Sequence, residues 1–275
     1  MRAHILSIGI TAPGITSFEA FKIMMLADAQ PNTSEELEKY SPSFLPANER
    51  RRTTATIKLA LSVAEEALEA YKASYPEADL QVPVLFVSRD GDSMISAKMC
   101  QAVSEEEPMI SPTQFHNSVH NAPAGYWMIG QGNQAPASAI SVGRYAIANG
   151  LLEAVLQSKS AQKPVLVVFY DLPVDPTIPI RDGQDSSLPF AFSMMIDSSE
   201  PISQSATDSN YPVLNLSLTL INKESPVVED NPYLGSAAAE AYPLLKSIAL
   251  FETSKEKKNI IFKLNEHNFV QVSLS

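Results

Sequence analysis

The sequence predicts an α/β fold in which helices cover both faces of a sheet. Over residues 1–170, apolar stretches of strand length alternate with stretches of helical periodicity, which is the pattern of layered α/β proteins. Residues 164–170 (PVLVVFY) are continuously apolar, as expected for a strand that is buried on both faces. Residues 53–71 carry apolar side chains at spacings of three and four, which predicts a long amphipathic helix.

The remaining elements follow from the same two periodicities and from turn residues. Apolar runs closed by turn signals predict strands at 4–10, 84–88, 137–141, 190–196 and 211–221, followed by two short strands within 259–275. Helical spacing predicts helices at 18–27, 92–103, 124–129 and 148–155, and at 236–251 with Pro243 inside. Residues 28–50 are polar and contain three prolines, which predicts a long loop.

Composition and charge exclude several classes of function. The net charge of −11 repels phosphate backbones and anionic lipid, so we expect neither nucleic-acid nor membrane binding. The single cysteine, Cys100, rules out an internal disulfide and a cysteine-rich zinc site. No apolar run approaches the roughly 18 residues of a spanning helix, and the N-terminus does not have the pattern of a signal peptide. We therefore expect a cytoplasmic protein.

Candidate metal and thiol sites are weak. His116 and His120 are four residues apart and could share a helix face, but no third ligand is apparent, which favours a structural or surface role. Cys100 lies in a helical stretch without a paired base, which favours a core thiol. Residues 90–92 (DGD) read either as an acidic metal loop or, preferably, as a turn with Asp92 capping a helix. No metal and no cofactor are expected.

Residues 111–171 resemble the β-ketoacyl synthase family. Residues 111–125 (SPTQFHNSVHNAPAG) match a family segment of the form S-P-x8-N-x-x-A-G. The match continues without a gap through Ala135-Pro136, where the family has Gly-Pro, and along residues 137–141 to a turn before a helix. In this register Arg144 occupies the position of the family's cysteine nucleophile.

The resemblance implies a fold and a domain organisation. We expect a thiolase-like half-fold, with α-β-α layers around a mixed five-stranded sheet and a short C-terminal helix and hairpin. Residues 1–275 would form a single ketosynthase-like N-terminal domain, in which 222–275 is a divergent extension. The family's second half, which supplies an HGTGT-type histidine, another histidine and a Gly-rich loop, does not occur in this sequence.

Without that machinery, the resemblance implies a protein that is not an enzyme by itself. Arginine stays protonated and cannot carry an acyl thioester. The pattern is similar to that of a truncated chain-length factor, as in aryl polyene biosynthesis, a polyketide or fatty-acid-type pathway. Such a subunit pairs with an active ketosynthase as a heterodimer, or in a higher assembly, shapes its acyl tunnel, and meets the acyl carrier protein only indirectly.

The resemblance also assigns interface residues. The strand that pairs across the dimer two-fold would comprise Ala137, Ser138, Ala139, Ile140 and Ser141. The side chains facing the tunnel or the partner would be Gln114, Phe115, Asn117, Val119, Asn121 and Trp127. Core packing is an equal alternative for Phe115 and Trp127. Arg144 would either pair with a carboxylate, such as Glu153 or Asp171, or contact substrate.

Two other functions stay open. A symmetric edge strand would permit a homodimeric scaffold or binding protein of thiolase ancestry. A hydrolase or decarboxylase that uses Ser141 or His120 is less favoured, because the sequence shows no Ser-His-Asp order.

Overall fold

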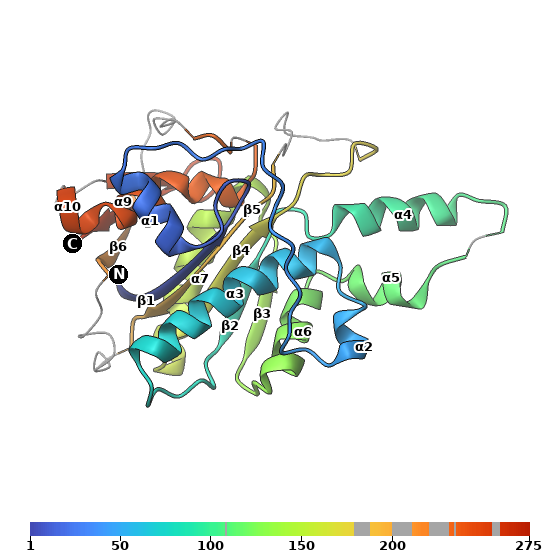
Figure 1. The fold of residues 1–275 in the computed structure, drawn as a ribbon, viewed down its shortest axis with the longest axis horizontal. Helices are drawn as coiled ribbons and strands as arrows, with labels where there is room; N and C mark the ends of the chain where they lie inside the picture. Colours follow the sequence, from blue (N-terminus) through green and yellow to red (C-terminus); the bar gives the residue numbers. More distant parts are fainter. Residues whose placement is uncertain (108, 179–187, 200–210, 220–230, 234, 255–258) are drawn as a thin grey trace.

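The computed structural model shows one mixed sheet with helices against both faces (Figure 1). It describes residues 1–107, 109–178, 188–199, 211–219, 231–233, 235–254 and 259–275. Within these residues eight strands hydrogen-bond in the order β3-β2-β4-β5-β1-β6-β8-β7. The strands are β1 (Arg2–Thr11), β2 (Val84–Val87), β3 (Ala137–Ile140), β4 (Val165–Asp171), β5 (Phe190–Asp197), β6 (Val213–Thr219), β7 (Asn259–Lys263) and β8 (Phe269–Leu274).

The layered α/β fold is confirmed, but the expected five strands are too few. Strand β2 is parallel to β3 and β4, and the other neighbouring pairs are antiparallel. The sheet extends beyond the five strands β3, β2, β4, β5 and β1. Strand β6 pairs with β1, and the C-terminal hairpin of β7 and β8 joins the sheet because β8 pairs with β6. The hairpin was expected, but its place in the main sheet depends on long-range pairing that local periodicity does not encode.

The helices follow the predicted pattern with two additions. Ser111 caps α5 by accepting a hydrogen bond from the Gln114 amide, a Ser-Pro start signal that the prediction missed. The loop at 28–50 ends in the short helix α2. The helices are α1 (Phe18–Leu26), α2 (Ala47–Arg50), α3 (Ala55–Ser74), α4 (Ser93–Val103), α5 (Pro112–Asn117), α6 (Ala122–Gln131), α7 (Ala146–Ala161), α9 (Tyr242–Ala249) and α10 (Phe251–Ser254), with 3-10 turns η1 (Gly143–Tyr145) and η2 (Ala238–Ala241).

Helix α3 covers one face of the sheet together with α6 (Figure 1). The expected apolar stripe of α3 is buried there and comprises Ile57, Leu61, Ala64, Leu68 and Tyr71. Two strand hydroxyls bond backbone carbonyls of the helix: Ser193 Oγ donates to Val63 O at 2.6 Å and Ser7 Oγ to Ala67 O at 2.7 Å. The helix backbone therefore lies very close to β1 and β5.

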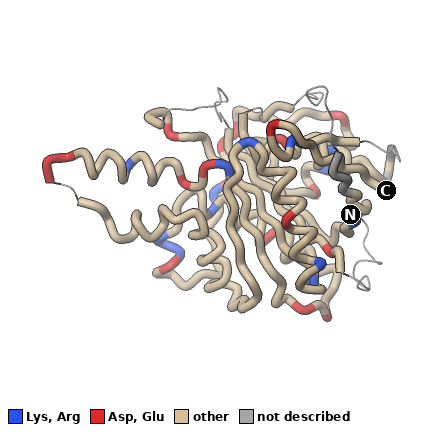
Figure 2. Tube along the Cα trace, turned by 180° about the vertical axis from the view of Figure 1, so that it is seen from behind, with Lys and Arg blue, Asp and Glu red and all other residues tan. Residues whose placement is uncertain are grey.

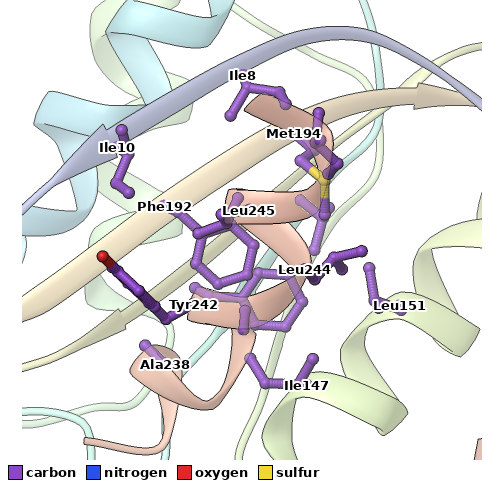
Figure 3. Packing of buried hydrophobic residues seen from close by; sticks show 14 of the residues in the cluster. Ile8, Ile10, Ile147, Leu151, Phe192, Met194, Ala238, Tyr242, Leu244 and Leu245 are labelled. Carbon is purple, nitrogen blue, oxygen red and sulfur yellow. The ribbon is translucent and has the colours of Figure 1, made fainter. Parts of the chain in front are cut away.

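The opposite face is covered by α7, α1 and residues 235–249, which we call the cover segment. Figure 3 shows Tyr242, Leu244 and Leu245 of this segment packed toward Phe192 and Met194 of β5, beside α7. Pro243, which the prediction placed inside a helix, lies in the first turn of α9, where no backbone N–H is needed. The cover segment thus forms part of the main core.

Helices α4 and α5 project from the body as an arm, residues 93–107 and 109–117 (Figure 1). Figure 2 shows that charges on this arm are sparse, with acidic residues gathered at its tip; the sequence places them at 105–107. Several large apolar side chains of the arm are exposed: Met94, Val103, Met109, Ile110 and Phe115. A projection with few charges outside its tip and with exposed apolar side chains indicates a contact surface.

Gly9→Ala should destabilise the fold, since a Cβ at residue 9 would collide with the Val63 carbonyl of α3. We expect a loss of roughly 1–3 kcal/mol in the free energy of unfolding, the usual cost of overpacking. Gly125→Ala is the matched control, because its Cβ would meet open space on α6. It should stabilise by about 0.5–1 kcal/mol. Equal effects of the two variants in urea unfolding would contradict the tight packing of α3 on β1.

Candidate functional site

The turn between β3 and α7 is the centre of the candidate site. Gly143 has a φ of 56°, a left-handed conformation that suits glycine, and η1 then leads directly into α7. The Arg144 guanidinium carbon lies 5.3 Å from the centroid of the Tyr145 ring, and its Nη2 donates to Tyr145 Oη at 3.2 Å. The expected strand, sharp turn and helix are therefore present, with an arginine at the turn.

Ser141 and His120 are both engaged with backbone carbonyls. The Ser141 hydroxyl donates to Arg89 O at 2.7 Å, and His120 Nε2 lies 2.8 Å from Ile140 O. These contacts join the ends of β2 and β3 to the segment before α6. They favour a structural role for both side chains over the nucleophile–base pair that a hydrolase would need.

Asp171, at the end of β4, is a buried carboxylate with three donors. Its Oδ1 accepts from Ser88 Oγ at 3.0 Å and from the Arg89 amide at 2.9 Å, and its Oδ2 accepts from the Ala238 amide at 2.9 Å. Burial raises the Asp171 pKa to about 7, and the three hydrogen bonds oppose that shift. One side chain thus connects β4, the end of β2 and the cover segment.

Glu240 of η2 brings a second carboxylate to this region. Burial and, after it, the negative charge of Asp171 raise the pKa of Glu240 to about 7. The positive charges of Arg89, Lys263 and Arg144 partly lower this pKa. Arg89 is only 8% exposed; its Nε pairs with Asp90 at 3.1 Å, and its buried Nη1 has no hydrogen-bond partner among the described residues. Sequence reasoning missed Glu240, because only the tertiary fold brings it to the turn.

The two carboxylates that the sequence offered to Arg144 have other contacts. Asp171 receives its hydrogen bonds from Ser88 and from two backbone amides. Glu153 Oε1 accepts from the side-chain Nε2 of Gln157, one turn along α7, at 2.9 Å. Neither side chain therefore has the contacts expected of a dedicated counter-ion for Arg144.

Among the strands that the structure describes, β3 lies at one end of the sheet order, with only β2 beside it. The Val84 amide donates to Pro136 O and the Ser88 amide to Ile140 O, so the carbonyls of residues 136 and 140 point toward β2. Because strand backbone groups alternate in direction, the amides and carbonyls of Ala137 and Ala139 point to the open edge. Residues 137–141, the expected pairing strand, are exposed or half-buried, and Ser141 lies just beyond the strand.

The predicted partner-facing residues divide into two groups. Phe115 is 61% exposed and Val119 48% exposed. Asn121 is exposed and Gln114 is half-buried. These four lie on or beside the arm, where a partner could reach them.

Asn117 and Trp127 are buried within the chain and do not face outward; for Trp127 this is the core-packing alternative. Asn117 Nδ2 donates to Arg52 O at 2.7 Å, and its Oδ1 accepts from Tyr126 Oη at 3.0 Å. Trp127 packs edge-on against Phe44, with ring centroids 5.6 Å apart. Helical rotation turns these side chains toward the loop before α3, so they fix α5 and α6 to the body.

The metal and thiol alternatives gain no support from the geometry. Within the described residues no three His, Cys, Asp or Glu side chains gather as metal ligands, and His116 packs against the Tyr126 ring. Cys100 is exposed, not in the core as expected, because α4 projects from the body and buries only its first turn. Asp92 caps α4 by accepting from the Ile95 amide, as predicted.

In the part of the chain that the structure describes, every helix is too short or too polar to cross a bilayer.

Comparisons with known proteins give one family and several solved structures. The model of the beta-ketoacyl synthase N-terminal domain matches residues 26–232. A search of curated proteins found no match. The chain is similar to one in the complex of a ketosynthase (ApeO) with its chain length factor (ApeC) from Xenorhabdus doucetiae, at 19% identity and a TM-score of 0.71, covering 99% of each chain.

Two further structures show how the length of this chain compares. The ishigamide ketosynthase/chain length factor matches at 11% identity and a TM-score of 0.71, with 100% of this chain and 99% of that chain covered. The ketosynthase from module 1 of the bacillaene synthase of Bacillus amyloliquefaciens FZB42 matches at 13% identity and a TM-score of 0.57, with 82% of this chain but only 47% of that chain covered. At these identities the likeness establishes the fold.

Replacing Asp171 or Glu240 by its amide should change how stability depends on pH. Both pKa values are raised above those of unfolded carboxyls, so the stability that each group contributes is present below about pH 4 and is lost as pH rises through about 7. The limiting slope is roughly 1.4 kcal/mol per pH unit per group. Asp171→Asn and Glu240→Gln should each flatten the fall in urea stability between pH 5 and 7.5.

Glu66, whose pKa burial also raises to about 7, should maintain part of the slope in both variants. Glu153→Gln is the control and should leave the curve unchanged. If the free energy of unfolding of the wild type increased from pH 5 to 7.5, the raised pKa values of these carboxyl groups would be contradicted.

Proposed function

Because the chain belongs to the β-ketoacyl synthase N-terminal domain family, we propose that it is a non-catalytic, chain-length-factor-like subunit that pairs with an active ketosynthase. The observation that carries the proposal is the arginine at the turn that matches the family's nucleophile position. A guanidinium stays protonated at physiological pH and cannot form an acyl thioester. The chain keeps the architecture of the turn without the nucleophile.

The extent of the structural matches supports the same proposal. The matched chains in the ApeO–ApeC and ishigamide complexes are almost fully covered by this chain, which means that they are of similar length. The bacillaene ketosynthase chain is about twice as long as the part that matches. We therefore propose that the chain assembles into a ketosynthase–chain length factor complex of the aryl polyene or a related polyketide type. In such a complex the acyl carrier protein would bind the active partner.

The proposed interface combines the open edge of β3 with the exposed apolar side chains of the arm. The free amides and carbonyls of Ala137 and Ala139 would pair with the corresponding strand of the ketosynthase and extend the sheet through both subunits. The arm would lie over the partner, where Phe115 and Val119 offer apolar area for its tunnel. Tunnel length would then depend on the volume of these side chains.

Ala139→Pro should abolish the heterodimer while leaving the chain folded. Proline removes the amide that points to the open edge and leaves the bonds of β3 to β2 in place, and proline is tolerated on edge strands. Ala139→Val keeps that amide and is the matched control. We would co-express each variant with the ketosynthase from the same genomic neighbourhood and measure the mass of the purified particle by native mass spectrometry.

The wild type and Ala139→Val should give one-to-one complexes, and Ala139→Pro should give separate subunits. A stable homodimer of the wild-type chain beside a free ketosynthase would replace the proposal with the scaffold alternative. A complex that survives Ala139→Pro would show that the edge strand is not the interface.

Phe115→Ala should lengthen the products of the reconstituted complex. The substitution removes an exposed aromatic ring from the arm, which would lengthen the space available to the growing chain by several carbons without changing the fold. Ile23→Ala is the control: Ile23 is 60% exposed, similar to Phe115 at 61%, but lies on α1 at the other end of the molecule. Mass spectrometry of the released acyl chains would decide. An identical product distribution for Phe115→Ala and wild type would exclude a tunnel role for Phe115.

A further inference from the structure

The arm and the edge strand β3 join the body of the molecule at neighbouring points. Helix α4 begins just after β2, and α5 leads through residues 118–121 into α6, which packs against β2 and β3. Figure 1 shows the arm extending from the same end of the sheet as β3. The arm therefore has two roots, which are the turn before α4 and the segment after α5.

The root of α4 is held by groups at the ends of two strands. Asp92 caps the helix, and the buried Ser93 Oγ accepts a hydrogen bond from the Asp175 amide, beyond β4, at 3.2 Å. Ser88 Oγ, just after β2, accepts from the Gly91 amide at 2.9 Å. The first turn of α4 is thus fixed to the carboxyl ends of β2 and β4.

The root of α5 is held by a buried asparagine. Asn117, the last residue of α5, donates through Nδ2 to Arg52 O at 2.7 Å and accepts through Oδ1 from Tyr126 Oη at 3.0 Å. Both partners belong to other parts of the fold, since Arg52 precedes α3 and Tyr126 lies on α6. Because both ends of the Asn117 amide are engaged, truncating this side chain would deprive two polar groups of their partner.

His120, in the segment after α5, lies between the other root and β3. Its Nε2 is 2.8 Å from Ile140 O, and since a carbonyl oxygen only accepts, Nε2 carries the proton. On the other side of the ring, Nδ1 lies 3.0 Å from the place that a Cβ on Gly91 would occupy. Gly91 has a φ of 61°, a conformation that suits glycine, so the turn before α4 approaches the ring closely. One histidine ring therefore separates the root of α4 from the end of the edge strand.

We propose that His120 and Asn117 are positioning residues that fix the direction of the arm relative to the open edge of β3. The proposal rests on the function proposed above, in which the edge strand and the arm contact the same ketosynthase. A partner binds both surfaces at once only when they are held at a matching angle. An arm that is already fixed also loses less conformational freedom on binding. The two residues act through the shape of the interface, and neither needs to contact the partner.

Energy transfer within the chain alone tests whether the arm is fixed. The sequence has one tryptophan, Trp127 on α6, and one cysteine, Cys100, which is exposed on α4. A fluorescent acceptor on Cys100 and the time-resolved emission of Trp127 give the distribution of distances between arm and body, with each variant referenced to its own unlabelled protein. The wild type should give a narrow distribution. In His120→Ala and Asn117→Ala it should be about twice as wide, because a root of the arm opens locally.

Two further variants separate positioning from a general loss of stability. His120→Gln keeps a donor near the position of Nε2 and should restore the narrow distribution. His267→Ala removes an exposed histidine from the turn between β7 and β8 and should match the wild type. An unchanged distribution in His120→Ala would overturn the role of His120, and the same result in Asn117→Ala would overturn that of Asn117.

Binding to the purified ketosynthase tests the consequence for pairing. The dissociation constant should rise about tenfold for His120→Ala and Asn117→Ala and should return to the wild-type value for His120→Gln. Unchanged affinity in a variant with a widened distance distribution would overturn the claim that the interface is preorganised. If the wild type formed no complex, the proposed function and this consequence would both fail, whereas the energy-transfer result would still decide whether the two residues fix the arm.

Discussion

The buried carboxylate of Asp171 is the interaction on which the geometry of the site depends. A carboxylate removed from water is costly unless donors surround it, and here Ser88, the Arg89 amide and the Ala238 amide supply them. These donors come from the end of β2 and from the cover segment. The position of the two Asp171 carboxylate oxygens therefore determines how β4, the end of β2 and the cover segment meet near the turn that carries Arg144.

This arrangement explains how the residues that match the family's N-terminal domain are covered on both faces of the sheet. The face of the sheet beside α7 requires apolar cover, and the cover segment supplies it from the same chain. The C-terminal hairpin extends the sheet beyond β6. At the opposite end of the sheet, among the described strands, the outer edge of β3 has no neighbour and lies beside an arm with exposed apolar side chains. The open strand edge and several exposed apolar side chains therefore lie at the same end of the molecule.

Sequence reasoning succeeded where a single element determines the outcome. The apolar run of β4 and the stripe of α3 are buried as predicted, because period and burial are local properties. The turn before α7 was expected from the family register of residues 135–144. Sequence reasoning failed where the burial of a side chain depends on the orientation of a short helix or on contacts between residues far apart in the sequence. Asn117 and Trp127 turn inward by small rotations on short helices, and Cys100 is exposed because α4 leaves the body.

The charged residues near the β3–α7 turn show most clearly that long-range contacts are not encoded locally. Arg144 and Asp171 were both singled out in the sequence, but their contacts depend on residues that are remote along the chain. Backbone amides such as that of Ala238 carry no sequence signal as donors, and Glu240 is one acidic residue in an alanine-rich stretch. Only the folded chain brings it, on η2, against β4 and α7.

The most direct test of the central claim is a reconstituted condensation assay with carrier-bound malonyl substrate. The complex of this chain with its ketosynthase should form product, and Arg144→Lys should leave that activity intact. Replacing the partner's catalytic cysteine by alanine should abolish it completely. Product formed by this chain alone, or by a complex whose partner lacks its cysteine, would contradict the account and place catalysis in this chain.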